Sequence, residues 1–397
     1  MVLAVAAHFI LQMLSPAPWV NLAPLLLAVA AISLLPERPV AGDRHGLNAA
    51  IVAIACFLAS YALSLILSTN RSASLEVLLA LLPGPLLFAL LLQLNDASMH
   101  SRQLALALNS SALVGSGYLL VVLLAFSAFT PVRVLSGYYS AAFVVPNDVL
   151  FLVCLSPFSL HLLLQEHRLG IRLFAAAGLL AMVVTVVLAE SRAGLLVFGA
   201  VLSGYALTRS WRLLLPGIVT LAAVLLAVDG LRGFAFLQDI TSLQSLTYRS
   251  VLWRAGIESF LQHPLAGHGP GTFAVIYENL LESGNQPADF DHDTRKIAWA
   301  HSLYIEALAE RGILGLASLA GLFGVALWLN LRNLREAGWQ WADWQIPVLV
   351  SLCALLLAGA IDLTFMRTWV MSLSFLLMGL CVIRPPTVDN GSGTLSS

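Results

Sequence analysis

Long apolar runs recur along most of the chain and restrict its fold more than any other feature. Many of them approach the roughly 20 apolar residues that a helix needs to cross a bilayer. Of all residues, 59% are hydrophobic and only 10% are charged, compared with about 25% charged residues in a typical soluble domain. A soluble core cannot bury so much apolar surface, so the sequence predicts a polytopic integral membrane protein.

Counting these runs predicts an all-α transmembrane helical bundle of about 12 spans. The expected spans are 2–15, 20–35, 47–67, 75–94, 103–127, 147–164, 172–190, 193–209, 213–230, 301–330, 346–361 and 368–384. Gly312 is expected to divide the tenth span into two half-helices. The chain therefore divides into spans 1–9 (1–230), one long and partly helical loop (231–300), spans 10–12 (301–384) and a disordered cytoplasmic tail (385–397).

The positions of arginine predict which side of the membrane each loop faces, because short cytoplasmic loops retain Lys and Arg. One alternating set of loops and the C-terminal tail holds Arg38, Arg44, Arg102, Arg168, Arg172, Arg209, Arg212, Arg332, Arg335 and Arg384. The opposite short loops hold only Arg71, Arg133, Arg192 and Arg367. Both termini are therefore expected in the cytoplasm. The long loop 231–300 is expected outside, which is the periplasm in a Gram-negative cell.

Charge and cysteine content exclude several other classes of protein. The formal net charge is −1 and the basic residues form no stripe, which argues against a nucleic-acid partner and leaves lipid as the main one. The cysteines form neither a CxxC metal motif nor an evident disulfide framework. We interpret them as small buried apolar residues; they are Cys56, Cys154, Cys353 and Cys381.

Arg192 is the most informative of the arginines on the predicted outer side. It lies in Glu190-Ser191-Arg192-Ala193-Gly194, a connection between two apolar runs that is short enough to hold the guanidinium at the membrane boundary. One interpretation is an anion-binding site at the level of the lipid head groups. The alternative is an anchor whose head group reaches back to water, or a pair with Glu190.

Residues 247–260 have helical periodicity and carry two further arginines. Arg254 has Glu258 four residues later, which suits an ordinary surface ion pair, whereas Arg249 has no acidic residue three or four positions away. Arg249 is therefore the stronger candidate for a functional role. The apolar face of this helix is expected to consist of Leu252, Trp253, Gly256, Ile257 and Phe260.

A turn rich in glycine and proline follows at 263–273, and it can bring backbone N–H groups close to a ligand. It lacks the Gly-Lys-Ser/Thr of a nucleotide-binding loop. His263 and His268 are interpreted as stabilising this turn, with His263 kept as a possible supporting residue. The segment Asp289-Phe-Asp-His-Asp293 is interpreted as a solvated loop in preference to a hard-cation site, because alternating positions in an irregular loop do not fix a coordination geometry.

His301 opens the helix that returns the chain to the membrane. The dipole at a helix N-terminus on the wet side of a bilayer favours a neutral imidazole, which suits a general base; the alternative is a merely capping or interfacial histidine. Tyr304 lies one turn further on and can share its face. Asp362, at the outer end of the eleventh span, either orients a base or pairs with Arg367, and the sequence leaves both possibilities open.

In order and spacing, these motifs resemble those of the O-antigen ligase and polymerase superfamily, which assembles bacterial surface polysaccharides. Four motifs from Ser191 to Gly315 carry the resemblance: Ser191-Arg192-x-Gly194, Arg249 near Trp253, His263-Pro-x-x-Gly267-x-Gly269-x-Gly-x-Phe273, and His301-Ser-x-Tyr304 with Glu310-x-Gly312-Ile313-x-Gly315.

The resemblance implies transfer of an O-antigen glycan from undecaprenyl diphosphate to a sugar hydroxyl of lipid A core, outside the bacterial inner membrane. It implies no metal, nucleotide or other cofactor. By the same resemblance His301 would be the base, and Arg192 and Arg249 would hold the diphosphate. Arg254 and Tyr304 are further candidates for donor binding, and Asp362, Arg367 and His263 are candidates for supporting roles.

Three alternatives remain. An O-antigen polymerase and a protein O-oligosaccharyltransferase would use the same donor with other acceptors, and the motifs do not specify the acceptor. A transporter or flippase for lipid-linked sugar would also have many spans and outer arginines, but it would need charges along its interior. Apart from Asp148, Glu190 and Asp362, the predicted spans are interpreted as nearly free of acidic residues, which favours an enzyme acting at the membrane surface.

Overall fold

The computed structural model describes residues 2–14, 18–33, 44–93, 97–126, 148–209, 212, 214–231, 233–234, 244–283, 299–339, 344–365 and 367–383. Within these ranges the regular structure is helical, without strands, as the all-α prediction requires. Each of the apolar runs predicted to span the membrane coincides with a helix or with two consecutive helices.

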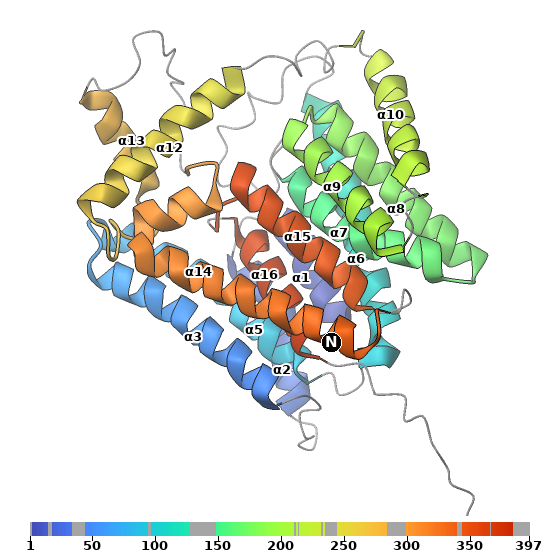
Figure 1. Cartoon of the computed structure of the whole chain (residues 1–397), viewed down its shortest axis with the longest axis horizontal. Coiled ribbons are helices and arrows are strands. Elements are labelled where there is room, and N and C mark those ends of the chain that lie inside the picture. The colour runs from blue at the N-terminus through green and yellow to red at the C-terminus, as the bar shows by residue number, and fades with distance from the viewer. Residues whose placement is uncertain are drawn as a thin grey trace, which may run out of the picture.

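The helices in these runs pack into one bundle (Figure 1). They are α1 (Val2–Leu14), α2 (Pro18–Ser33), α3 (Arg44–Ile66), α4 (Arg71–Ala80), α5 (Pro83–Leu91), α6 (Ala97–Phe126), α7 (Val149–Gln165), α8 (Leu169–Leu188), α9 (Arg192–Arg209), α10 (Leu214–Gly230), α14 (Leu303–Glu336), α15 (Gln345–Ile361) and α16 (Thr368–Val382). Two more helices, α12 (Gln244–Gln262) and α13 (Phe273–Glu282), come from the predicted outer loop and lie together at one end of the bundle.

Five helical segments are long and apolar enough to cross a membrane, judged by length and composition. They are Arg44–Ile66, Arg71–Leu91, Ser101–Leu123, Leu169–Leu188 and Leu303–Glu336. Several shorter apolar helices accompany them. The chain is thus a membrane protein with several spanning helices, and the number of about 12 spans stays a prediction.

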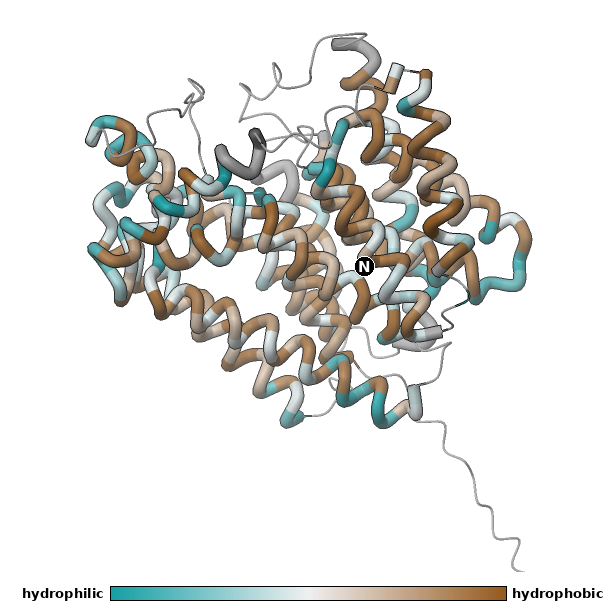
Figure 2. Tube along the Cα trace, turned by 45° about the horizontal axis from the view of Figure 1, so that its top comes forward, coloured by the Kyte–Doolittle hydropathy of each residue, from teal (hydrophilic) through white to brown (hydrophobic). Residues whose placement is uncertain are grey.

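Large apolar side chains cover much of the outside of the bundle. Figure 2 shows hydrophobic residues along the lengths of the helices and hydrophilic residues gathered towards their ends and on α12 and α13. Leu27 is 71% exposed and Leu207 is 85% exposed, which suits a surface that contacts lipid. Cys56 and Cys353 are also exposed, so the expectation of four buried cysteines holds only for Cys154 and Cys381.

The two ends of the bundle carry different elements. α3 and α14 run antiparallel, because Ser64 donates to the Glu310 carbonyl at one level and Ser60 contacts Ser318 at another. Arg44 and Arg332 therefore lie towards the same end. At the opposite end lie α12 and α13, the Gly-rich turn between them and the start of α14.

α14 is kinked at Gly312, where φ is 63° and ψ is −160°. This confirms the expected division into two half-helices. A side chain at this position would be strained, because its Cβ would lie 2.4 Å from the backbone carbon of Leu265. The kink releases backbone groups that need other partners. The N–H groups of Ile313 and Leu314 donate to the carbonyls of Pro264 and Leu265, at 2.8 and 3.3 Å.

The Gly-rich turn fills this kink instead of facing a ligand, so the prediction that its N–H groups serve a ligand is wrong for 268–269. The N–H groups of His268 and Gly269 donate to the carbonyls of Ala309 and Glu310, at 3.1 and 2.9 Å. The Glu310 carboxylate also accepts the N–H of Phe273 at 3.1 Å. The turn is therefore a structural wedge that fixes the angle between the two halves of α14.

Candidate functional site

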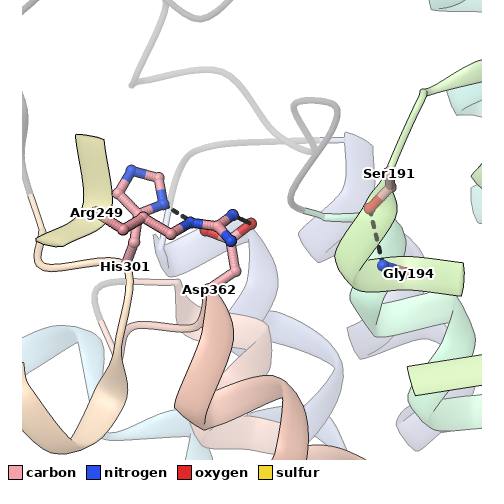
Figure 3. A network of polar contacts seen from close by, with 5 residues as sticks. All are labelled: Ser191, Gly194, Arg249, His301 and Asp362. Carbon is pink, nitrogen blue, oxygen red and sulfur yellow. Dashed lines mark hydrogen bonds and ion pairs between the residues drawn. The ribbon is translucent and has the colours of Figure 1, made fainter. Parts of the chain in front are cut away.

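His301 and Asp362 come together from two different helices at the end of the bundle that carries α12. His301 has a left-handed backbone (φ 51°) and precedes Ser302, the residue that caps α14. The helix thus begins at Leu303, two residues after the expected start. Asp362 is the C-terminal cap of α15. Nδ1 of His301 hydrogen-bonds Oδ1 of Asp362, as Figure 3 shows.

This contact determines which nitrogen of His301 is available for chemistry. A carboxylate only accepts hydrogen bonds, so Nδ1 carries the proton and donates it to Asp362. In the neutral ring, Nε2 is then left with its lone pair. The Asp362 side chain is 5% exposed and that of His301 19%, so the acid is buried while the imidazole remains accessible.

Arg249 joins the pair from α12. Its Nη2 lies 3.5 Å from Oδ2 of Asp362, so the two carboxylate oxygens are divided between a histidine and an arginine. Of the two alternatives left open for Asp362, its contact with His301 is therefore the one that the structure contains. Arg249 finds its acidic partner across the bundle and not on its own helix, which is consistent with the absence of an acid three or four positions away.

Arg367 is held by another acid, so the alternative pair between Asp362 and Arg367 is not formed. Its Nη1 lies 2.8 Å from Oδ2 of Asp148, and Trp369 donates its indole N–H to the other oxygen of Asp148 at 2.7 Å. The Trp299 ring lies 5.0 Å from the Arg367 guanidinium and 5.3 Å from the His301 ring. Trp299 therefore contacts both Arg367 and His301.

Arg192 lies at the same end of the molecule, on a neighbouring helix. The turn before it contains Glu190 with φ 53°, and Ser191 Oγ accepts the N–H of Gly194 at 3.1 Å, which caps α9. α9 packs on α15 with Gly204 against Val350.

Arg192 lies twelve residues before Gly204 on α9, and Asp362 lies twelve residues after Val350 on α15. Figure 3 shows Ser191 and Gly194 beside the cluster of Arg249, His301 and Asp362, not within it. Arg192, between these two residues in the chain, therefore belongs to a separate turn beside the cluster.

Two of the predicted donor-binding residues have structural partners. Arg254 Nε lies 2.7 Å from Oε1 of Glu258, the surface pair that the spacing suggested. The Tyr304 hydroxyl donates to the Leu356 carbonyl at 2.8 Å, so this phenol points towards α15 and does not share a free face with His301.

His263 lies at the wedge, outside the cluster around His301. Its ring is 4.2 Å from that of His268. Burial lowers the pKa of His268, and the charge of nearby His263 lowers it further. Both histidines therefore belong to the turn, as the sequence interpretation favoured.

Glu306 and Thr364 form a buried contact close to Asp362 in the chain that the sequence did not predict. Oγ1 of Thr364 donates to Oε1 of Glu306 at 2.5 Å, and both side chains are buried. This bond ties the first turn of α14 to the segment that directly follows Asp362. The interpretation that the predicted spans are nearly free of further acids is wrong here, because Glu306 and Glu310 are both buried in α14. An acidic residue in an apolar helix is costly without a partner. The presence of Glu306 in a predicted span therefore indicated that it has a buried partner.

The described ranges contain no group of three or more His, Cys, Asp or Glu residues that could hold a metal ion. The segment Asp289-Phe-Asp-His-Asp293, considered above as a cation site, lies outside the described residues.

Comparison with known proteins gives a family match over part of the chain. Residues 177–320 match the family described as O-Antigen ligase. No curated protein matches the chain significantly. The matched segment contains α9, α12, α13 and the first half of α14, and with them Arg192, Arg249 and His301. This match supports the place of the chain in the O-antigen ligase and polymerase superfamily.

Proposed function

We propose that this membrane protein transfers an O-antigen glycan from undecaprenyl diphosphate to a sugar hydroxyl of lipid A core. The family match indicates a glycosyl-transfer enzyme of the O-antigen ligase or polymerase kind, acting on lipid-linked polysaccharide. The observation that carries the more specific proposal is the cluster of His301, Asp362 and Arg249. In this proposal the cluster faces the periplasm from the inner membrane.

In the proposed reaction His301 is the general base. Asp362 holds Nδ1 in its protonated form, so Nε2 is free to accept the proton of the attacking hydroxyl. The carboxylate also stabilises the imidazolium that forms. Such an arrangement of a carboxylate behind a histidine recurs in unrelated enzymes that activate hydroxyl groups.

Arginines are proposed to bind the leaving group. The bond from the anomeric carbon to the diphosphate oxygen breaks as the acceptor oxygen attacks, and the diphosphate departs with the bonding electrons. Negative charge therefore grows on the diphosphate in the transition state, where a fixed guanidinium stabilises it more than in the ground state. Arg249, which is part of the cluster, is the first candidate, and Arg192, in the turn beside the cluster, is the second.

The proposed stereochemistry follows from direct displacement. The acceptor oxygen enters opposite the leaving diphosphate, so the configuration at the anomeric carbon inverts. The proton leaves the acceptor hydroxyl for His301 Nε2. Neither a metal ion nor a nucleotide takes part in the proposed steps.

Reconstitution tests the proposal and separates it from its alternatives. Purified protein in liposomes is given an undecaprenyl-diphosphate glycan with one of three acceptors: lipid A core, a second lipid-linked repeat unit, or a serine-containing protein. We expect a joined product with lipid A core and without nucleotide. Product only with the repeat unit would replace the ligase with a polymerase, and product only with protein would establish a protein transferase. Movement of the lipid across the bilayer without any joined product would indicate a transporter.

A further inference from the structure

Glu306 is a buried acid in the first turn of α14, and it takes no direct part in the proposed transfer. Its side chain is 4% exposed, and it lies five residues after His301 in the chain. An acidic side chain in an apolar membrane helix is costly, and such residues usually mark a functional site. The presence of Glu306 at this position therefore needs a reason beyond the packing of α14.

The Glu306 carboxylate contacts the segment that follows Asp362. Oγ1 of Thr364 donates to its Oε1 at 2.5 Å. Thr364 is 1% exposed and lies two residues after Asp362, the C-terminal cap of α15. Leu363 between them is also buried, so the segment is packed on both sides and moves as a unit. A displacement of Thr364 therefore displaces Asp362 as well.

Glu306 also contacts the residues on both sides of His301. The backbone N–H of Ala300 interacts with the same carboxylate. The backbone N–H of Glu306 donates to the Ser302 carbonyl at 2.9 Å. His301, between these two residues, has φ 51°, a conformation that a residue other than glycine keeps only where its surroundings impose it. The contacts of Glu306 on either side of His301 supply that constraint.

Other contacts hold the first turn of α14 against α15. The Tyr304 hydroxyl donates to the Leu356 carbonyl at 2.8 Å. A Cβ added at Gly359 would lie 3.4 Å from the Leu303 side chain, so the two helices are in close contact there. Neither contact involves the Glu306 carboxylate. The two helices therefore stay packed when the carboxylate contact is lost, and only the segments beyond them are free to shift.

We propose that Glu306 is a positioning residue, whose bond to Thr364 holds the Asp362 carboxylate in register with Nδ1 of His301. The proposal rests on the proposed function only for the reaction that His301 and Asp362 carry out. Glu306 acts through these two residues and not on the reacting atoms. When either segment shifts, the imidazole loses the partner that keeps its proton on Nδ1 and leaves Nε2 free.

Glu310, one turn further along α14, provides a matched comparison. It is also 4% exposed, but its carboxylate accepts the N–H of Phe273 at 3.1 Å and so holds the wedge. Glu306 and Glu310 are thus equally buried acids on one helix with different contacts. A loss that reflects burial alone should appear in variants of both, whereas a loss of positioning should appear only in variants of Glu306.

Variants of Thr364 test the bond with the smallest change in shape. Thr364→Val keeps the shape and removes the hydroxyl, whereas Thr364→Ser keeps the hydroxyl. In full-length protein in liposomes, we expect Thr364→Val to lower kcat roughly 10- to 100-fold, since a displacement of about 1 Å can cost this much. The KM for the donor should change less than about threefold, because α12 is held by the wedge. Thr364→Ser should stay within about threefold of the wild-type kcat.

A double-mutant cycle shows whether the two residues act through one bond. Glu306→Met fills a similar volume but offers no oxygen acceptor. Because either change breaks the same bond, the double variant Glu306→Met/Thr364→Val should lose no more kcat than the more damaged single variant. Losses that multiply in the double variant would overturn the proposal, and so would the wild-type kcat in folded Thr364→Val protein.

The tautomer of His301 gives a readout that needs no turnover. In protein with isotope-labelled histidine, the ring nitrogen resonances of His301 are identified by their absence from His301→Ala protein. We expect wild-type and Glu310→Gln proteins to keep the proton on Nδ1, and Thr364→Val protein to show a mixture of both tautomers. A lower thermal midpoint of Thr364→Val protein with an unchanged tautomer would show a merely structural bond and overturn the proposal. If wild-type protein joins no donor to any acceptor while Thr364→Val still mixes the tautomers, the proposed function fails and the positioning role stands.

Discussion

The carboxylate of Asp362 contacts two residues at once, His301 and Arg249. Oδ1 accepts a hydrogen bond from His301 Nδ1, and Oδ2 lies 3.5 Å from Nη2 of Arg249. A buried carboxylate is stable only with such partners, because leaving it unpaired in a low dielectric is costly. The same contacts fix the orientation of the imidazole and the place of the guanidinium. In the proposed mechanism Asp362 is therefore the residue that aligns the base, His301, with the diphosphate-binding group, Arg249.

Asp362→Asn tests that alignment. The amide keeps the shape but loses the charge that stabilises the imidazolium and holds Arg249. We expect kcat to fall roughly 10²–10⁴-fold, the range seen when general-base catalysis or the carboxylate of a serine-protease triad is lost. Initial rates and thermal unfolding measured on the same purified protein check this. Glu336→Gln at the opposite end of the molecule is the control and should remain active. A folded Asp362→Asn protein with the wild-type rate would contradict the assignment.

Arg249 and Arg254 form a matched pair on one helix. Arg249 contacts Asp362 at the cluster, whereas Arg254 is an exposed partner of Glu258. We expect Arg249→Ala to lower kcat/KM for the donor roughly 10²-fold, the effect of removing one hydrogen-bonding group from a developing charge. Arg254→Ala should lower it less than about fivefold, since an exposed ion pair contributes at most ~1 kcal/mol. Equal losses in the two variants would return Arg254 to the donor site.

Single residues could be predicted from sequence where a local rule applied. The i, i+4 spacing identified the pair of Arg254 with Glu258 and set Arg249 apart. Asp362 could not be resolved, because its two possible partners lie in loops whose mutual position depends on the packing of α12, α14 and α16. Thr364 carried no signal at all, since a lone threonine beside an apolar helix has no pattern until Glu306 is seen to face it.

At the scale of elements, the kinked α14 and the Gly-rich turn form one unit. The kink at Gly312 frees N–H groups, and the turn supplies the carbonyls that accept them. In return, N–H groups of the turn donate to carbonyls of the first half of α14. Because α12 precedes this turn directly, the unit also fixes the helix that carries Arg249. The first half of α14 and α12 should therefore move as one body.

Gly312→Ala is expected to break this unit. The new Cβ would lie 2.4 Å from the backbone of Leu265, in a backbone conformation that is almost confined to glycine. We expect the variant to be less stable by about 3 kcal/mol, measured as a lower thermal midpoint in detergent. Gly324→Ala on the same helix has no atom within 4 Å of the added Cβ and should be neutral or slightly stabilising. Similar midpoints for the two variants would refute the wedge.

The residue ranges of the helices were predicted more accurately than the contacts that the helices and turns make. The apolar runs predicted the helices because hydrophobic length and spacing are local properties of the sequence. On α12, Leu252 and Gly256 are buried as expected, but Ile257 is exposed, because the helix packs on α14 through a face that also includes Val251 and Ala255. The turn at 263–273 was recognisable as a turn, yet its partner in the kink is an interaction between segments about 40 residues apart, which local spacing cannot reveal.

The described part of the molecule has two different ends, with the cluster of His301 at one and the helix ends that carry Arg44 and Arg332 at the other. The arginine bias predicted Arg44 and Arg332 on one side, because each crossing reverses the side of the next loop. The number of membrane crossings stays a prediction, since helices such as α15 and α16 are shorter than the helices that are long enough to cross a membrane. The acceptor was beyond prediction, because neither motifs nor spans specify it.

Cysteine labelling tests the sidedness of the whole molecule. Glu258 on α12 and Glu336 at the end of α14 are both exposed and lie at opposite ends. In intact cells whose outer membrane is permeabilised, a membrane-impermeant maleimide should label Glu258→Cys and leave Glu336→Cys unlabelled. Inverted membrane vesicles should give the opposite result. Labelling of Glu336→Cys alone in cells would place the cluster in the cytoplasm and remove the periplasmic assignment.

The central claim is that His301 takes the proton of the acceptor as the glycan leaves its polyprenyl diphosphate. The most direct measurement is a single-turnover assay in liposomes that compares wild-type protein with His301→Ala and with the wedge variant His263→Ala. We predict joined product from wild-type and His263→Ala proteins. His301→Ala protein should bind the donor with unchanged affinity but form no product. Wild-type turnover by folded His301→Ala protein would contradict the account.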